Sequence, residues 1–110
     1  MKSELGKIER ANFIITSEGL IGLQLTLTGR NWGSVDTSYA TLDLNKHPVR
    51  DGIGDDTQTR LSKYALVLKN ISDLLHKAKV HSVKDLEGTP VEIMFENKTL
   101  KNWRVLEEVL

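Results

Sequence analysis

The sequence contains no cysteine, has two prolines and few aromatic residues, and its charges cancel. The lack of cysteine excludes disulfides, thiolate metal sites and cysteine nucleophiles. Aromatic residues make up 5% of the 110 residues, so leucine, isoleucine and valine must fill most of the core. The 15 basic and 15 acidic residues argue against a protein whose main task is to coat DNA or an anionic membrane.

Long hydrophobic runs are also missing. No apolar stretch approaches the roughly 20 residues that span a bilayer, and the opening MKSELGKIER lacks the apolar core of a signal peptide. We therefore expect a cytoplasmic protein with no membrane partner. The length and the 39% apolar content predict one domain, residues 1–110, with a single core.

Strand patterns occupy both ends of the chain. Between residues 20 and 28, Ile21, Leu23, Leu25 and Leu27 alternate with smaller or polar residues, which is typical of a half-buried strand. In the first strand, Ala11, Phe13 and Ile15 are expected to face the core. The five predicted strands are Lys7–Thr16, Leu20–Thr28, Val35–Leu44, Pro90–Glu96 and Thr99–Val109.

One long helix is predicted over Thr57–Ala78, with Asp56 or Thr57 as its N-cap. We expect an α+β fold: a five-stranded, mainly antiparallel sheet in the order β-β-β-α-β-β, with this helix packed on one face. The segment Asn45–Asp56 is predicted to be a loop. The apolar stripe of the helix consists of Leu61, Tyr64, Ala65, Leu68, Ile71, Leu75 and Ala78.

The loop Gly29–Gly33 is the first candidate contact site, because two glycines bracket Arg30, Asn31 and Trp32. Arginine offers a planar set of donors and tryptophan a stacking face, which together suit a base, a nucleotide or an acidic protein surface. In the alternative, Trp32 folds back over the sheet edge and Arg30 is solvated. Leu66 is a second candidate contact, since it projects from the polar side of the helix and is surrounded by lysines.

A basic patch made by the helix and the C-terminal hairpin is a further hypothesis, with solvated faces as the alternative. Its members are Lys63, Lys69, Lys77, Lys101 and Arg104.

Catalytic and metal-binding patterns are weak. The histidines His47, His76 and His81 show no nucleophile motif and no recognised ligand spacing. The acidic stretch Asp51–Asp56 lacks the alternating ligands and distal glutamate of a calcium loop, and its carboxylates would repel a phosphate. We expect no enzymatic activity, no cofactor and no metal. An enzyme acting through His47 is the weakest hypothesis.

Four segments carry a resemblance to a known group: LGKIERANF, GRNWG, AKVHSVKDLEGTPVEI and FENKTLKNWRVLEEVL. Their order resembles small proteins encoded on phages and prophages, which carry a KIE-type start, a glycine-rich loop with Trp or Phe, an LxGxxV connection and a closing LKxW strand. The resemblance implies a phage accessory protein in the bacterial cytoplasm. It carries over no catalytic residue.

Two functions therefore remain. The first is a non-catalytic protein that occupies the surface of a host bacterial protein, as an inhibitor of a defence system. The second is a nucleic-acid or nucleotide binder that uses the basic patch and stacking by Trp32. The free edges of an antiparallel sheet also allow a homodimer.

Overall fold

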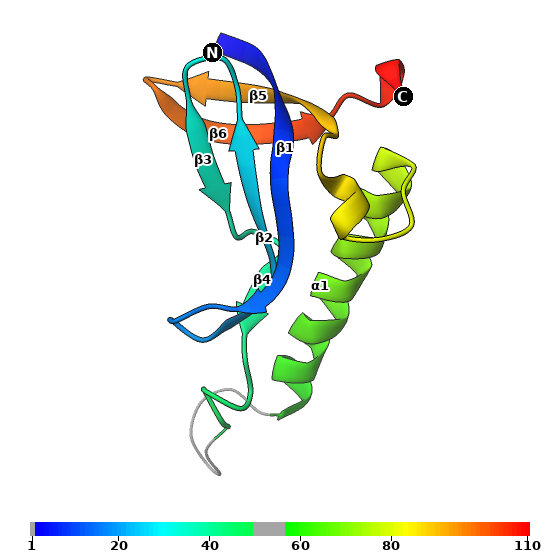
Figure 1. Cartoon of the computed structure of the whole chain (residues 1–110). Helices are drawn as coiled ribbons and strands as arrows, with labels where there is room; N and C mark the ends of the chain where they lie inside the picture. Colours follow the sequence, from blue (N-terminus) through cyan, green and yellow to red (C-terminus); the bar gives the residue numbers. More distant parts are fainter. Residues whose placement is uncertain (1, 50–56) are drawn as a thin grey trace.

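The computed structural model describes residues 2–49 and 57–110, and within these ranges it confirms an α+β fold with one long helix (Figure 1). Two short 3-10 turns, η1 and η2, accompany the regular elements. The elements are β1 (Lys2–Ile15), β2 (Leu20–Thr28), β3 (Gly33–Asp36), β4 (Ala40–Leu42), α1 (Thr57–Ala78), η1 (Lys84–Leu86), β5 (Pro90–Glu96), β6 (Thr99–Val105) and η2 (Glu107–Val109).

The strands form one antiparallel sheet in the order β3-β2-β1-β5-β6, and β4 also pairs with β2. The long strand β1 joins two hairpins: Lys7–Ile15 pairs with β2, and Lys2–Lys7 pairs with β5. The register shifts between Ile8 and Arg10, which is the mark of a β-bulge. Because a bulge bends its strand, β5 and β6 run across the upper end of the sheet (Figure 1).

Three strand predictions need correction. The first strand begins at Lys2 instead of Lys7 and ends at Ile15 instead of Thr16, because Lys2–Lys7 pairs with β5. Val35–Leu44 is not one strand, because a turn separates β3 from β4: the Asp36 carboxylate accepts hydrogen bonds from the N–H (3.2 Å) and hydroxyl (2.9 Å) of Ser38. Both pieces lie beside β2. The last strand ends at Val105, because the chain turns into η2.

The core lies between the inner face of the sheet and the C-terminal half of the helix. Ile71, Leu74 and Ala78 are buried there. Their partners on the sheet and in η1 are Ile8, Ala11, Leu23, Leu25, Leu27, Leu86, Val91, Ile93 and Val105.

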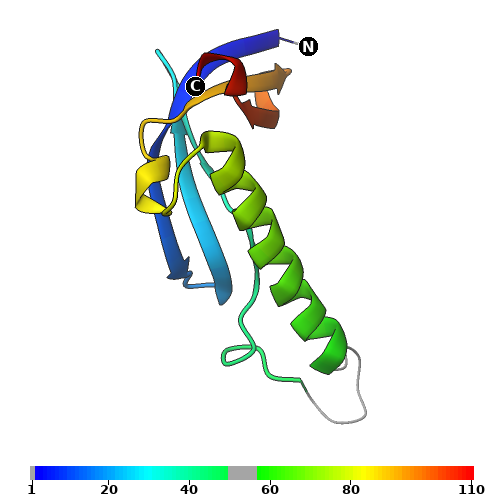
Figure 2. The ribbon, with the colours of Figure 1, turned by 90° about the vertical axis from the view of Figure 1, so that its right-hand side faces the viewer.

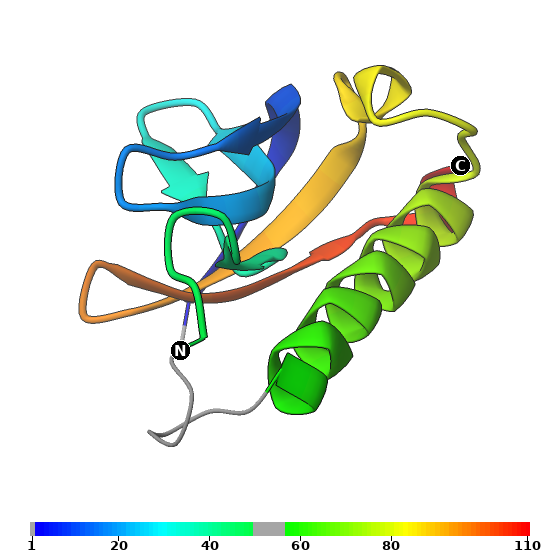
Figure 3. The same cartoon turned by 90° about the horizontal axis from the view of Figure 1, so that it is seen from below.

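The helix does not cover the whole inner face. Its N-terminal half diverges from the β1–β2 hairpin (Figure 2), and seen from below it lies to the side of that hairpin (Figure 3). Its closest approaches to strands are to β4 and β6. Ala11 is buried as predicted, but the prediction that Phe13 and Ile15 are core residues is wrong, since both are exposed.

Candidate functional site

The outer edge of β1 is paired along only part of its length. Lys2–Lys7 pairs with β5, and Ile8 continues this edge by donating its N–H to the Thr89 carbonyl (2.9 Å) and accepting from the Gly88 N–H (2.7 Å). Between residues 12 and 15, no segment within the described ranges pairs with this edge. Among the described residues, the last four positions of β1, residues 12–15, therefore form an open edge.

The backbone of Phe13 and Ile15 points out of that open edge. Leu23, which lies opposite Phe13, donates its N–H to the Tyr39 carbonyl on its other side (3.1 Å), so Phe13 and Leu23 form a non-hydrogen-bonded pair. Such pairs alternate with bonded ones in an antiparallel ladder. The N–H and C=O groups of Phe13 and Ile15 thus face away from β2, where a further strand could pair with them.

Glu87 marks the start of the open edge. Its Oε2 accepts the Ala11 N–H (3.2 Å) and a hydrogen bond from Lys84 (3.1 Å). The Lys84 ammonium, followed by the Ala11 N–H, holds the pKa of the Glu87 carboxyl below its ordinary value. The Glu87 carboxylate thus accepts the N–H of β1 at Ala11, as the Thr89 carbonyl does at Ile8.

Apolar side chains line the space between this edge and the helix. Phe13 is 57% exposed on the sheet side, and Leu68 is 70% exposed on the helix side. Leu61, Leu68 and Leu75 follow one another at intervals of two helical turns, so they form one row along α1. We call this space the β1–α1 groove; its walls are Phe13, Ile21, Val67, Leu68, Ile71 and Leu75.

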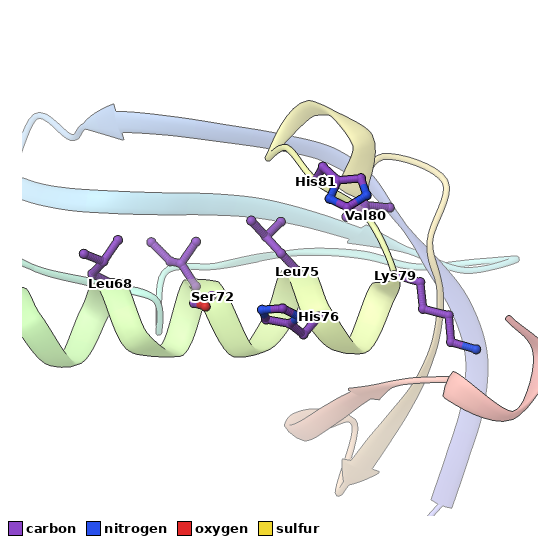
Figure 4. A pocket seen from close by; sticks show the side chains of 8 residues that line it. Leu68, Ser72, Leu75, His76, Lys79, Val80 and His81 are labelled. Atoms are coloured by element: carbon purple, nitrogen blue, oxygen red, sulfur yellow. The ribbon is translucent and has the colours of Figure 1, made fainter.

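The β1–α1 groove consists of two adjoining hollows of about 140 Å³ and about 550 Å³ that share Leu68 and Ile71. The smaller hollow lies against Phe13 and Ile21. The larger one continues along α1 to its C-terminal end. Leu68 and Leu75 point from the helix toward β1 and β2, and at the end of the helix His81 approaches from the loop that follows (Figure 4).

The end of α1 shapes the larger hollow. Lys79 has a left-handed backbone (φ 58°), the Val80 N–H donates to the Leu75 carbonyl (3.0 Å), and the Lys79 N–H donates to the His76 carbonyl (3.1 Å). This is the Schellman arrangement, which satisfies the last carbonyls of a helix and turns the chain back. It places Val80 and His81 against the groove.

The groove is apolar along most of its length and basic at this end. His76, Lys79 and His81 are its basic lining residues, and Lys79 also donates to the Leu110 carbonyl (3.1 Å). Among the described residues that line either hollow, none is Asp or Glu. The groove therefore suits an apolar ligand that carries a negative charge at one end.

The predicted contact residues of the Gly29–Gly33 loop do not form a projecting tip. Trp32 is half-buried, and its indole meets Phe95 edge to face at a centroid separation of 5.4 Å. A Cβ at Gly29 would lie 2.2 Å from the indole Nε1, and one at Gly6 would lie 2.9 Å from its Cζ2. The structure thus has the alternative in which Trp32 folds back. Arg30 and Asn31 remain exposed.

Leu66 is 58% exposed, as the sequence predicts. Two residues along a helix correspond to about 200° of rotation, so Leu66 and Leu68 lie on nearly opposite sides of α1. Leu66 is not a wall of the groove. Its role as a partner contact stays a prediction.

The five predicted nucleic-acid contacts are not all available to phosphates. Lys69 donates to Asp73 (2.8 Å), and Arg104 donates to both Glu92 (2.9 Å) and Glu108 (2.9 and 3.0 Å). These carboxylates raise the pKa of the Arg104 guanidinium and neutralise its charge locally. Lys63, Lys77 and Lys101 are exposed.

His47 connects two parts of the fold through hydrogen bonds. Its Nε2 lies 2.9 Å from the Glu18 carbonyl, and its own carbonyl accepts a hydrogen bond from buried Arg60 (2.5 Å). These contacts tie the β1–β2 turn to the start of α1. The acidic stretch Asp51–Asp56 lies outside the described residues.

Neither a metal site, a membrane-spanning helix nor a known family is found for the described part of the chain. Within the described ranges, no group of His, Asp or Glu is arranged to hold a metal ion, and no helix is long and apolar enough to cross a bilayer. Comparison of the chain with protein-family models, with curated proteins and with solved structures gives no match. The candidate site rests on its own geometry.

The sequence predicts Phe13 in the core and places Leu68, Ile71 and Leu75 on the apolar stripe of the packed helix. The apolar sector of α1 covers about half of its circumference, which is wider than one sheet face needs. That excess is the sequence signal of a second apolar surface. Which part of it stays open depends on where the helix crosses the sheet.

Proposed function

We propose that this chain is a non-catalytic binding protein that takes up a segment of a partner protein in the β1–α1 groove. The observation that carries the proposal is the open edge of β1 at residues 12–15, beside a row of exposed and half-buried leucines on α1. Unpaired strand edges and exposed apolar patches are both surfaces by which proteins associate.

The sequence resemblance to phage and prophage accessory proteins suggests the organism from which the partner comes, namely the bacterial host. We propose that the partner is a cytoplasmic protein of the bacterial host, and that occupying its surface inhibits a defence system. The nucleic-acid alternative has less support, because Lys69 and Arg104 are engaged by carboxylates and Trp32 packs on the sheet.

Two leucines of one helix provide the test. Leu68→Asp places a carboxylate in the groove, whereas Leu66→Asp places one on the opposite side of α1 at similar exposure. Wild-type and variant chains are immobilised and exposed to bacterial lysate. We expect a host protein that binds wild type and Leu66→Asp alike and binds Leu68→Asp at least about tenfold more weakly.

Circular dichroism and urea unfolding serve as controls for the folding of both variants. Equal capture by Leu68→Asp and wild type, or no capture by wild type, would contradict the proposal.

A further inference from the structure

The two walls of the β1–α1 groove differ in kind, since one is the backbone edge of β1 and the other is a row of side chains on α1. We propose that the partner segment binds as an added strand, antiparallel to β1, with apolar residues at alternate positions and an acidic group at its C-terminal end. This inference rests on the proposed function and specifies the chemistry of the bound segment.

The backbone wall selects an extended chain. Phe13 and Ile15 present N–H and C=O groups at a spacing of two residues, which is the repeat of a β-strand. A bound helix would not pair with them, because its own backbone groups are satisfied internally. Added strands gain main-chain hydrogen bonds at such edges and specificity from pockets for alternate side chains.

The side-chain wall selects apolar residues at every second position. The strand period turns alternate side chains of an added segment toward the face that carries Phe13. Leu68 and Ile71 belong to both hollows, so such side chains would meet leucine and isoleucine along the groove. The intervening side chains would point to the other face of the sheet, where Asn12 is exposed.

The two ends of the groove select a direction. The end near Ala11 is bounded by η1 and lined by His76, Lys79 and His81, and the Glu87 carboxylate beside it is paired with Lys84 (3.0 Å). The Phe13–Ile15 end lacks such basic lining residues among those described. A strand antiparallel to β1 has its C-terminal end near Ala11. An acidic side chain or a terminal carboxylate there would face the basic residues.

A library of random peptides of about twelve residues, long enough for one strand, tests this directly. We expect the full chain to select peptides with apolar residues at i, i+2 and i+4 followed by an acidic residue. Binding of a selected peptide should slow amide hydrogen exchange of Phe13 and Ile15 at least about tenfold. N-methylation of alternate peptide amides should abolish binding, and methylation of the others should not.

Matched variants separate this inference from the proposed function. Leu68→Asp should lose the selected peptides and Leu66→Asp should keep them. Apolar residues at helical spacing, unchanged exchange of Phe13 and Ile15, or no selected peptide would overturn the strand mode. A dimer whose Phe13 and Ile15 amides are protected without peptide would also overturn it, since a second copy would then be the occupant. Host-protein capture that depends on Leu68 would still support the proposed function in these cases.

Discussion

At the residue scale, the half-buried Trp32 indole packs against the hydrophobic core. It lies over Gly6 and Gly29, where a side chain would collide with it, and it meets Phe95 edge to face. Trp32→Ala should therefore lower the free energy of unfolding by about 2–3 kcal/mol, somewhat less than a fully buried tryptophan. Urea unfolding measures this loss.

The control for Trp32 is its neighbour Arg30, which is exposed. Arg30→Ala should change the free energy of unfolding by less than about 0.5 kcal/mol. Equal effects of the two substitutions would mean that the indole does not pack on the sheet.

Glu108 gives a prediction on pH. Its two oxygens accept from Arg104, and this guanidinium lowers the pKa of the Glu108 carboxyl to about 2. A pKa that is lower in the folded state contributes stability above the unfolded-state pKa, and this contribution is lost as pH falls through the folded pKa. The window is therefore about pH 4.5 down to about pH 2.

We expect wild type to lose more stability across that window than Glu108→Gln, which has no carboxyl to titrate. Urea unfolding at several pH values measures the difference, and a carbon NMR titration of Glu108 should give a midpoint near 2. Parallel losses in the two proteins, or a midpoint near the ordinary value, would show that the pair with Arg104 does not form in solution.

The two tryptophans show how far local pattern determines a residue's place. Trp103 lies in a strand with Val105, so its parity predicts the core side, and it does pack against the core. Trp32 lies in a turn that has no period. Its position depends on Gly6, which belongs to a distant strand, and local sequence does not specify that contact.

At the scale of elements, the start of α1 is attached by polar contacts instead of apolar packing. The Leu44 N–H donates to the Tyr64 hydroxyl (2.6 Å), which lies 3.4 Å from Oδ1 of fully buried Asp43. Tyr64→Phe removes the partner of the Leu44 N–H, whereas Asp43 keeps the Asn45 N–H (3.3 Å). A donor left without its partner away from water costs about 1–3 kcal/mol. Thermal or urea unfolding should show a loss of this size.

Ser62 provides the comparison for Tyr64, because its hydroxyl also makes a hydrogen bond, to the Gln58 carbonyl (2.9 Å), but on an exposed surface. Ser62→Ala should be within about 0.5 kcal/mol of wild type. If Tyr64→Phe is equally neutral, the network around Asp43 does not hold the helix.

Elements with a strong local period were predictable, and interrupted ones were not. The helix has the predicted bounds because its apolar stripe and polar face persist from Thr57 to Ala78. The segment after Trp32 has strand-forming residues throughout, but Asp36 and Ser38 form a local turn that divides it into β3 and β4. Side-chain hydrogen bonds to nearby backbone compete with the ladder in such segments.

At the scale of the whole molecule, the chain is more extended than a sphere of its length. The radius of gyration is 15.7 Å, whereas a compact domain of this size has about 13 Å. The N-terminal half of α1 extends beside the sheet, and this arrangement leaves Leu61 and Leu68 exposed. The sequence predicts which side chains are apolar. The position of the helix relative to the sheet decides which of them are covered.

The most direct test of the β1–α1 groove is amide hydrogen exchange along β1 in the free chain. An open edge predicts alternation: the amides of Phe13 and Ile15 exchange rapidly, and those of Asn12 and Ile14, which face β2, are protected by at least about tenfold more. Equal protection at all four positions would mean that another segment already covers the edge, and this would contradict the β1–α1 groove as a binding site.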